Sequence, residues 1–487
     1  MAKLDGWKRG WTVCLLCVAT TIAAYGQKLT TMVIFDGTSG EYPNAPLVQG
    51  IDGNLYGTTE RGGAYGWGTF FQMTPSGLLT TLYNFCAQLN CTDGAAPGPL
   101  ILGTDGNFYG TTGAGGRQRQ QCEPALGCGT MFRITLAGKL TTLYRFCAKT
   151  QCMDGFAPEG ALVQGVDGNL YGATIGGGSY TQCDPPYGGC GTVFKFDPNG
   201  LTTLHSFDRS DGENPDTGLV QAPNGVFYGT TPYLGEGSGE GTLYSVTSDG
   251  TFNTLHSFEG SDGSEPSSLT LGTRSGVLFG ATEAGGTSGQ GTLFTTTLQG
   301  LVTTIYSFDS YSVPSTPIEG NDRKFYGTTA YGGTNSCPFV HCGTIFLVSS
   351  KGILTTLYNF DGSDGYAPGT LLQSTTGNFY GTTAEGGDFT CPNGPNGCGT
   401  AFRLDEGLDS FIAFVQAAGR IGKTARILGQ GFTGTTGVSF NGTPAAFTVT
   451  SDTFLAATVP DGATTGYVTV TTSSGKLTSN MPFHVLP

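Results

Sequence analysis

The sequence predicts an all-β protein, a seven-bladed β-propeller followed by a small immunoglobulin-like β-sandwich. A motif close to NLYGTT occurs seven times, with a mean spacing of 54 residues between Tyr56 and Tyr380, and this period is in the range of propeller blades. Four short β-like runs fill each repeat. Glycine accounts for 82 of 487 residues and 38% of the residues are hydrophobic, a composition typical of a turn-dense β protein rather than of a disordered chain.

Residues 1–26 have the features of a secretory signal peptide. Lys3, Lys8 and Arg9 precede the apolar run WTVCLLCVATTIAA, and small residues follow at Ala24 and Gly26, which is the order found in such signals. The apolar run is too short to span a bilayer, and no later stretch approaches the ~20 apolar residues that a transmembrane helix needs. We therefore expect a secreted or cell-surface protein with no transmembrane segment beyond the signal peptide.

The charge of the chain limits its partners. The formal net charge is −14 at pH 7. Nucleic acids and anionic membranes are bound by clustered Lys and Arg, so this balance argues against both as partners.

Each repeat is predicted to contain four strands, A to D, separated by turns. In the first copy they are APLVQGID, NLYGTTE, GTFFQMT and LLTTLYNF. Dipeptides such as Asp52-Gly53 and Asn224-Gly225 connect A to B, and glycines such as Gly77 connect C to D; such residues supply the positive φ of tight hairpins. Repeated four-stranded antiparallel meanders build a propeller. The B-strand aromatics are Tyr56, Tyr109, Tyr171, Tyr228, Phe279, Tyr326 and Tyr380.

The recurrent glycines are expected to serve packing. A blade lies between two neighbours, so both faces of its middle strands should be buried, and the B-strand glycine should let a side chain of the adjacent blade approach the backbone. The Gly-Thr pair that opens every C strand has the same explanation. A phosphate-binding loop is excluded, because no Lys-Ser/Thr follows and no helix is predicted.

The chain has eight D-like strands for seven A-B-C sets. The first is LTTMVIF at residues 29–35, and the last is LDSFIAF at residues 408–414. We expect residues 29–35 to pair with residues 399–404 and close the ring, because closure removes exposed strand edges that invite aggregation. This assigns residues 27–407 to the propeller and residues 408–487 to the second domain.

The cysteines of the mature chain occur in pairs. Antiparallel strands place the D-to-A and B-to-C loops on one face, where every lengthened loop contains two cysteines and no plain loop contains any. In an exported protein this predicts six local disulfides. Zinc is disfavoured because the spacings are not C-x2-C and only His341 lies between any pair, so we expect no metal there. The predicted pairs are Cys86/Cys91, Cys122/Cys128, Cys147/Cys152, Cys183/Cys190, Cys337/Cys342 and Cys391/Cys398.

An acid follows the phenylalanine of the D strand wherever the next loop lacks cysteine. Such a residue can cap the turn with backbone hydrogen bonds, or pairs such as Asp361 and Asp364 can form a weak Ca²⁺ site. We favour the cap and expect no other cofactor. The acids are Asp36, Asp208, Glu259, Asp309 and Asp361.

Aromatic residues in the B-to-C loops are the candidate ligand-binding residues. Such side chains can stack on sugar rings or anchor a protein partner; the alternative is that they pack within their own loops. The candidates are Tyr65, Trp67, Tyr180, Tyr187, Tyr233 and Phe339.

From about residue 408 the repeat stops and cysteine is absent. Short β-like runs such as TARILG, GVSFNG and YVTVTTS are separated by Gly, Asn, Asp and Pro turns, which is the pattern of a small β-sandwich. The segment Gly422 to Lys476 resembles the IPT/TIG family of immunoglobulin-like domains. In bacterial surface proteins these domains act as spacers or adhesive modules, so the resemblance implies a similar role here.

The repeats resemble the GloVer tandem repeat of bacterial exported proteins. The resemblance rests on LTTLYNFDGSDGYAPGTLLQSTTGNFYGTTAEGG and its copies, over about residues 29–404. It implies a location outside the cytoplasm. It brings no established activity and no catalytic residues to transfer.

No catalytic constellation is visible in the sequence. His205 and His256 occupy a D-strand site where other copies have Tyr, and His341 and His484 lie apart from them; a pair of catalytic carboxylates is recognised by distance, which needs coordinates. We leave catalysis open and favour its absence.

We expect an exported binding, adhesion or scaffold protein, a monomer that presents the disulfide-stapled face to an extracellular glycan or protein. The alternative is an extracellular polysaccharide-acting enzyme, a lyase or glycosidase, on a propeller scaffold. A cluster of acids at the mouth of the ring would favour the enzyme, and a mouth lined by exposed aromatics would favour the binder.

Overall fold

The chain is built almost entirely from antiparallel β-sheets. The computed structural model describes residues 28–119, 122, 127–180, 183, 188–235, 239–273, 276–337, 342–349, 351–391 and 396–487. The helices among these are two short 3-10 turns, η1 (Leu89–Cys91) and η2 (Thr150–Cys152). The predicted signal peptide lies outside the described residues.

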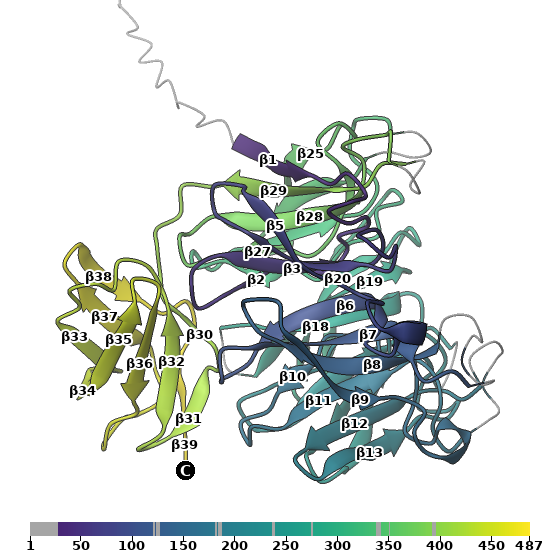
Figure 1. Ribbon diagram of the computed structural model, residues 1–487, viewed down its shortest axis with the longest axis horizontal. Helices are drawn as coiled ribbons and strands as arrows, with labels where there is room; N and C mark the ends of the chain where they lie inside the picture. The colour runs from purple at the N-terminus through teal and green to yellow at the C-terminus, as the bar shows by residue number, and fades with distance from the viewer. Residues whose placement is uncertain are drawn as a thin grey trace, which may run out of the picture.

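Six four-stranded sheets follow one another along the chain from residue 48 to residue 359, each with its strands in sequence order (Figure 1). Sheet 1 contains β2 (Val48–Gln49), β3 (Leu55–Thr59), β4 (Thr69–Met73) and β5 (Leu79–Asn84). Sheet 2 contains β6 (Ala95–Leu102), β7 (Phe108–Gly116), β8 (Gly127–Ile134) and β9 (Leu140–Arg145). Sheet 3 contains β10 (Val163–Gln164), β11 (Leu170–Thr174), β12 (Thr192–Asp197) and β13 (Gly200–Ser206).

Sheets 4 to 6 repeat the same order. Sheet 4 contains β14 (Val220–Gln221), β15 (Phe227–Thr231), β16 (Thr242–Val246) and β17 (Phe252–Ser257). Sheet 5 contains β18 (Ser264–Leu271), β19 (Val277–Ala284), β20 (Thr292–Thr297) and β21 (Val302–Ser307). Sheet 6 contains β22 (Ile318–Glu319), β23 (Phe325–Thr329), β24 (Thr344–Val348) and β25 (Leu354–Asn359).

Sheet 7 joins the two ends of the repeat region. It contains β26 (Tyr366–Pro368), β27 (Leu372–Gln373), β28 (Phe379–Glu385) and β29 (Thr400–Asp405). Its outer strand is β1 (Lys28–Ile34), which pairs antiparallel with β29 so that Leu29 lies opposite Leu404. The first strand of the described chain therefore completes the last sheet.

The B-strand glycines lie against a ring of their own sheet. Gly57 lies opposite Phe71 in the register of β3 with β4, and a Cβ added to Gly57 would lie 2.5 Å from the Phe71 ring. The same contact recurs at the other six glycines, with Phe or Tyr of the C strand. The expectation that this side chain comes from the adjacent blade was wrong: the cross-strand partner already occupies the space above the glycine.

The second threonine of the motif joins the B strand to the C strand. In sheet 1 the hydroxyls of Thr59 and Thr69 are 2.9 Å apart, and both residues are fully buried. Because a buried hydroxyl without a partner is costly, the Thr of TT and the Thr of GT are required together. The pairs are Thr59–Thr69, Thr112–Thr130, Thr174–Thr192, Thr231–Thr242, Thr282–Thr292, Thr329–Thr344 and Thr383–Thr400.

The glycine of the Gly-Thr pair joins each sheet to the next one. Gly68 has a φ of +96°, and a Cβ added there would lie 2.6 Å from Cδ of Pro97 in the following sheet. Only glycine combines this φ with this contact. The contact series ends with Gly399 of sheet 7 against Pro43, just before sheet 1. The pairs are Gly68–Pro97, Gly129–Pro158, Gly191–Pro215, Gly241–Pro266, Gly291–Pro314, Gly343–Pro368 and Gly399–Pro43.

The remaining strands form two further four-stranded sheets and a two-stranded one. The first contains β30 (Ala413–Phe414), β32 (Thr424–Leu428), β36 (Phe454–Thr458) and β35 (Phe447–Ser451). The second contains β34 (Thr443–Ala445), β33 (Gly437–Phe440), β37 (Val468–Thr472) and β38 (Gly475–Thr478). The short sheet pairs β31 (Ala418–Arg420) with β39 (His484–Leu486) in parallel.

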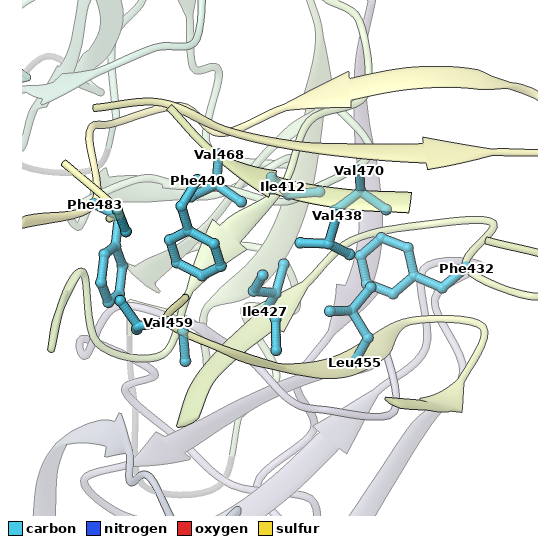
Figure 2. Close-up of a cluster of buried hydrophobic side chains, with 13 residues drawn as sticks. Ile412, Ile427, Phe432, Val438, Phe440, Leu455, Val459, Val468, Val470 and Phe483 are labelled. Atoms are coloured by element: carbon cyan, nitrogen blue, oxygen red, sulfur yellow. The ribbon is translucent and has the colours of Figure 1, made fainter. Parts of the chain in front are cut away.

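A continuous apolar core lies between these C-terminal sheets. Figure 2 shows Ile427 and Leu455 from one sheet and Val438 and Phe440 from the other directed toward each other. All four are at most 3% exposed. Burial of such side chains contributes about 1.5–3 kcal/mol each, so this module has a core of its own.

The C-terminal module contacts the hairpin end of the repeat region. Thr453 Oγ1 donates to the carbonyl of Ile51 in the A-to-B hairpin of sheet 1 (2.8 Å), and Asn321 Nδ2 of sheet 6 donates to the carbonyl of Asp409 (2.7 Å). Gln416 Nε2 donates to the carbonyl of Gln164 in sheet 3 (3.3 Å). Figure 1 shows the module, in yellow-green, beside this end of the sheets.

Candidate functional site

The six predicted disulfides are present and all lie in D-to-A or B-to-C loops. We call the loop face of sheets 1 to 7 that carries them the stapled face. Each disulfide closes a separation of 5 to 7 residues, for which the chain-entropy model gives about 2 kcal/mol. Six disulfides are consistent with an extracytoplasmic protein. The pairs are Cys86–Cys91, Cys122–Cys128, Cys147–Cys152, Cys183–Cys190, Cys337–Cys342 and Cys391–Cys398.

The pairing follows the predicted local scheme. The second cysteine of several disulfides is not at the surface. Cys342 is fully buried, and its N–H donates to the carbonyl of Asn335 in the same loop (3.2 Å). Cys128, Cys152 and Cys398 are equally buried. The disulfides therefore hold the loops from inside, and a ligand of the stapled face would contact other side chains.

The disulfides support a strained contact between sheets. The residue before each repeat proline is not glycine and has a positive φ; the seven are Tyr42, Ala96, Ala157, Asn214, Glu265, Val313 and Ala367. This conformation is costly for a residue with a side chain and persists where the surroundings enforce it. Ala157 N–H donates to the carbonyl of Cys128, and Asn214 N–H to the carbonyl of Cys190 (3.0 and 2.9 Å). The second cysteine of these disulfides thus holds the pre-proline residue of the next sheet.

Three of the five acids after the D strands, Asp36, Asp208 and Asp361, cap their turns with their carboxylates. At Glu259 the acceptor is instead Asp262, which takes the Glu259 N–H. Asp361 accepts hydrogen bonds from the backbone N–H and hydroxyl of Ser363 (3.0 and 2.7 Å), and these bonds hold the pKa of Asp361 below its ordinary value. Asp36 and Asp208 make equivalent contacts. Ca²⁺ at Asp361 and Asp364 stays an untested expectation, and both carboxylates already serve as turn acceptors.

The two D-strand histidines have the partner that tyrosine has in other sheets. His205 Nε2 lies 2.7 Å from Asp211 Oδ2, whereas Tyr144 OH donates to Asp154 Oδ2, also at 2.7 Å. His256 has the same relation to Asp262. Because the same position works with either side chain, the geometry of these His–Asp pairs indicates a structural role.

The aromatic candidates are spread over the stapled face. Tyr65, Tyr180 and Tyr233 are each about half exposed, and Trp67 is partly buried. Tyr180 lines a cavity of about 390 Å³ together with Lys149, Met153 and His205. The other two candidates, Tyr187 and Phe339, lie outside the described residues.

A second cavity of the stapled face gathers acids from different sheets. It has a volume of about 500 Å³. We call it the acidic pocket. Its polar side chains are three carboxylates, from Glu60, Glu159 and Asp216, and the neutral groups of Tyr42, Asn44 and Thr58. Its lining includes Tyr42, Pro46, Glu60, Pro97, Pro99, Gly113, Phe156, Glu159 and Asp216.

The carboxylates of this pocket repel one another. Enclosure by protein and the charges of Glu159 and Glu283 raise the pKa of Asp216 to about 7. The pKa of Glu159 is raised by the same enclosure and by Glu60, and that of Glu283 by enclosure and by Glu265. Asp216, Glu159 and Glu283 are nevertheless exposed residues, so the pocket is open and desolvates their carboxyl groups only in part.

The acids of the pocket are not arranged to chelate one metal ion. In the described part of the chain, the groups of three His, Cys, Asp or Glu ligand atoms within 4.8 Å of one another are Cys122 with Cys147 and Cys152, and Glu41 with Cys391 and Cys398. All five of these cysteines are in disulfides. The pocket carboxylates are farther apart than a single ion would require.

Sequence reasoning missed the acidic pocket. The four acids at or beside it occupy two repeat positions. Glu159 and Asp216 follow the proline, and Glu60 and Glu283 follow the B-strand threonines. Aligning these positions by repeat would have placed all four acids on one face.

Comparison with known proteins gives the family of the chain. The model of the Gloeobacter/Verrucomicrobia repeat matches residues 18–233, 119–337 and 180–394, which together cover more than half of the chain. The chain belongs to this family. A search of curated proteins found no relative of this chain.

Comparison with solved structures shows the fold of this chain. A streptogramin B lyase structure matches with a TM-score of 0.51 and 12% identity, over 78% of this chain and 97% of that one. A catalytically inactive variant of the virginiamycin B lyase of Staphylococcus aureus, with quinupristin, matches with the same TM-score and identity, over 78% and 99%. At this identity the likeness concerns the fold alone, which is propeller-like.

The described residues contain no helix that is long and apolar enough to cross a membrane.

Proposed function

We propose that residues 27–407 form a closed seven-bladed β-propeller and that residues 408–487 form an immunoglobulin-like domain of the IPT/TIG type. Seven sheets with one repeated inter-sheet contact support the ring, as does the return of that contact from Gly399 to Pro43. Two facing four-stranded sheets around one core support the second domain. In this arrangement β1 is the closing strand.

We infer that the protein is an exported binding or adhesion protein whose stapled face takes an extracellular ligand, a glycan or a protein. The observation that supports this most is the difference between the two ends of the sheets. The hairpin end is contacted by the C-terminal module at sheets 1, 3 and 6. The stapled face carries the six disulfides, the exposed aromatics and two open cavities.

A glycan array of the mature chain, with and without reductant, tests this function. We expect at least one bound glycan and weaker binding after reduction. The variant Tyr180→Ala should lower binding about tenfold, because stacking on a ring is lost. Leu78→Ala is the matched control, since Leu78 is a large exposed side chain (67%) in a C-to-D hairpin. Loss of binding in Leu78→Ala but not in Tyr180→Ala would contradict a binding role of the stapled face.

The alternative function is an extracellular polysaccharide-acting enzyme, a lyase or glycosidase. The cluster of acids at the stapled face favours it, because a carboxyl with a pKa near 7, as for Asp216, suits general acid–base catalysis at neutral pH. The fold is also shared with a lyase. Incubation with uronate-containing and neutral polysaccharides, followed by ultraviolet absorbance and reducing ends, tests it. Product formed by the wild type and not by Asp216→Asn would replace the binding function.

A further inference from the structure

We propose that the acidic pocket binds a basic side chain of a partner polypeptide, an arginine or lysine inserted with its cationic group between the carboxylates. The proposal rests on the stapled face being the binding face and specifies the chemistry that this face recognises. Glu159, Asp216 and the adjacent Glu283 supply the negative charge, from three different sheets.

These three carboxylates have no basic partner among the described residues. Within the described ranges, no Lys, Arg or His lines the pocket. Arg61, outside this lining, pairs with Glu60 at 3.3 Å. The Arg61 guanidinium also lies 4.9 Å from the ring centroid of Tyr42, a cation–π arrangement. At Glu60 and Tyr42, which line the pocket, a guanidinium of this chain therefore lies against a carboxylate and a ring, whereas Glu159 and Asp216 have no such counterpart in the described part of the chain.

A buried hydroxyl beside Asp216 is an independent sign of a missing ligand. Tyr244 is fully buried, and its OH has no hydrogen-bond partner. A Cβ added to Gly229 would lie 2.5 Å from this OH, so the hydroxyl extends over the B strand toward the A-strand side of the sheet. Asp216 is the charge that, with burial, raises the Tyr244 pKa. An unsatisfied buried hydroxyl is costly, and a ligand cation held by Asp216 would offer it a donor.

The Tyr244 hydroxyl is also peculiar to sheet 4. The six equivalent C-strand positions are phenylalanine, namely Phe71, Phe132, Phe194, Phe294, Phe346 and Phe402. Packing against the B-strand glycine therefore needs only the ring. The hydroxyl occurs in the one sheet that also contributes Asp216.

The shape of the pocket favours an amino-acid side chain over an ion or a sugar. The carboxylates are too widely spaced to chelate one metal ion. The walls contain Pro46, Pro97 and Pro99, which suit the methylene stem of arginine or lysine. An amino sugar, in contrast, carries hydroxyl groups on every side. Planar, weakly hydrated guanidinium groups are the usual partners of carboxylates and rings together.

Binding of an arginine-containing peptide tests the proposal. The control peptide has citrulline, the neutral isostere, in place of arginine. We expect the mature chain to bind the arginine peptide at least about tenfold more tightly, the usual size of one charge-assisted contact. Glu159→Gln, Asp216→Asn and Glu283→Gln should each weaken it several-fold. Asp461→Asn, an exposed acid of the C-terminal module, changes the net charge equally and should leave binding unchanged.

The variant Tyr244→Phe separates binding from folding. Because it installs the residue that the other six sheets have, the fold should be retained, and removal of an unsatisfied hydroxyl should leave the melting temperature equal or higher. We expect weaker binding of the arginine peptide. Unchanged binding in Tyr244→Phe would overturn the role of the hydroxyl.

The outcomes distinguish this proposal from the function on which it rests. Equal binding of the arginine and citrulline peptides would overturn the pocket proposal, even if a glycan bound through Tyr180 kept the stapled face as the binding face. Tighter binding of a chitosan oligosaccharide than of the arginine peptide, lost in Asp216→Asn, would overturn the polypeptide assignment. If Asp461→Asn weakened binding of the arginine peptide as much as the pocket variants do, the binding would depend on non-specific charge, and the pocket proposal would be overturned.

Discussion

The hydroxyls of the B-strand motif have three different partners. Tyr171 OH donates to Asp167 in the preceding hairpin (2.7 Å), and Thr174 is paired with Thr192 of the C strand (2.8 Å). In sheet 1, Thr58 donates across the gap to the carbonyl of Gly98 in the next sheet (2.8 Å). A six-residue motif thus carries hairpin, sheet and inter-sheet contacts, and this explains why it recurs with few changes.

The hairpin bond of Tyr171 has a measurable contribution. Tyr171→Phe should lower the free energy of unfolding by about 1.5–3 kcal/mol, because the acceptor is a carboxylate. Tyr228→Phe is the control, since its partner is the neutral Asn224 (2.9 Å), and should cost about 1 kcal/mol. Urea unfolding of both variants measures this. Equal losses would contradict the charge-assisted role of Asp167.

The raised pKa of Asp216 predicts a pH-dependent stability. The folded pKa of about 7 lies above the unfolded value, so the folded state binds a proton that the unfolded state lacks between about pH 4 and 7. The stability contribution of this group therefore rises as the pH falls from about 7 to about 4. Asp216→Asn should melt higher than the wild type at pH 8, and the difference should narrow below pH 7 and vanish near pH 4, at the unfolded pKa. Glu159, Glu265 and Glu283 face this group. A pH-independent difference in melting temperature would contradict the assignment.

At the scale of the element, each sheet contacts the next one through a glycine and a proline. Gly191 has a φ of +98°, with Pro215 Cδ only 2.6 Å and the Thr174 carbonyl 2.3 Å from an added Cβ. Five of the seven A strands have only two residues, as in β10 (Val163–Gln164), although the sequence predicted longer ones. Hydrogen bonding by these A strands is therefore limited, and the loops before them carry contacts between sheets.

Replacement of the inter-sheet glycine should be far more damaging than replacement of a hairpin glycine. Gly168 in the same sheet has a φ of +84° and nothing within 4 Å of an added Cβ. Gly168→Ala should cost about 1–2 kcal/mol, the penalty of the left-handed conformation. Gly191→Ala adds a backbone and proline clash and should cost severalfold more or prevent folding. Thermal unfolding monitored by circular dichroism compares them, and similar losses would contradict the tight contact.

At the scale of the whole molecule, the first described strand completes the last sheet. β1 covers the edge of β29, which is otherwise a row of free backbone donors and acceptors. Exposed edges of this kind promote association. The pairing joins residues that lie more than 350 positions apart in the sequence.

Removal of residues 28–35 should expose this edge. We expect the shortened chain to form oligomers or aggregates and to unfold at lower temperature than the full mature chain. Size-exclusion chromatography with light scattering measures the first effect and calorimetry the second. A shortened chain that remains monomeric with an unchanged unfolding temperature would show that β1 is dispensable.

The strand order and the disulfides could be predicted from the sequence because both depend on near neighbours. The four runs of each repeat and the pairs such as Cys86 with Cys91 lie within one repeat, where turn residues and spacing decide the structure. The neighbour of each B-strand glycine was predicted wrongly, since the pattern of the strand alone does not tell a cross-strand ring from the side chain of another sheet. The acidic pocket was missed for a related reason: its acids come from sheets 1, 3 and 4.

The sequence by itself determined the all-β repeat, the family and the covalent staples, because each is written in residues at short and regular spacing. Only the tertiary structure decided that Glu159, Asp216 and Glu283 share one electrostatic environment and that the Tyr244 hydroxyl, whose pKa Asp216 helps to raise, is buried without a partner. Carboxylates more than 50 residues apart interact only when successive sheets bring them to one pocket, and Coulomb interaction depends on distance in space rather than along the chain.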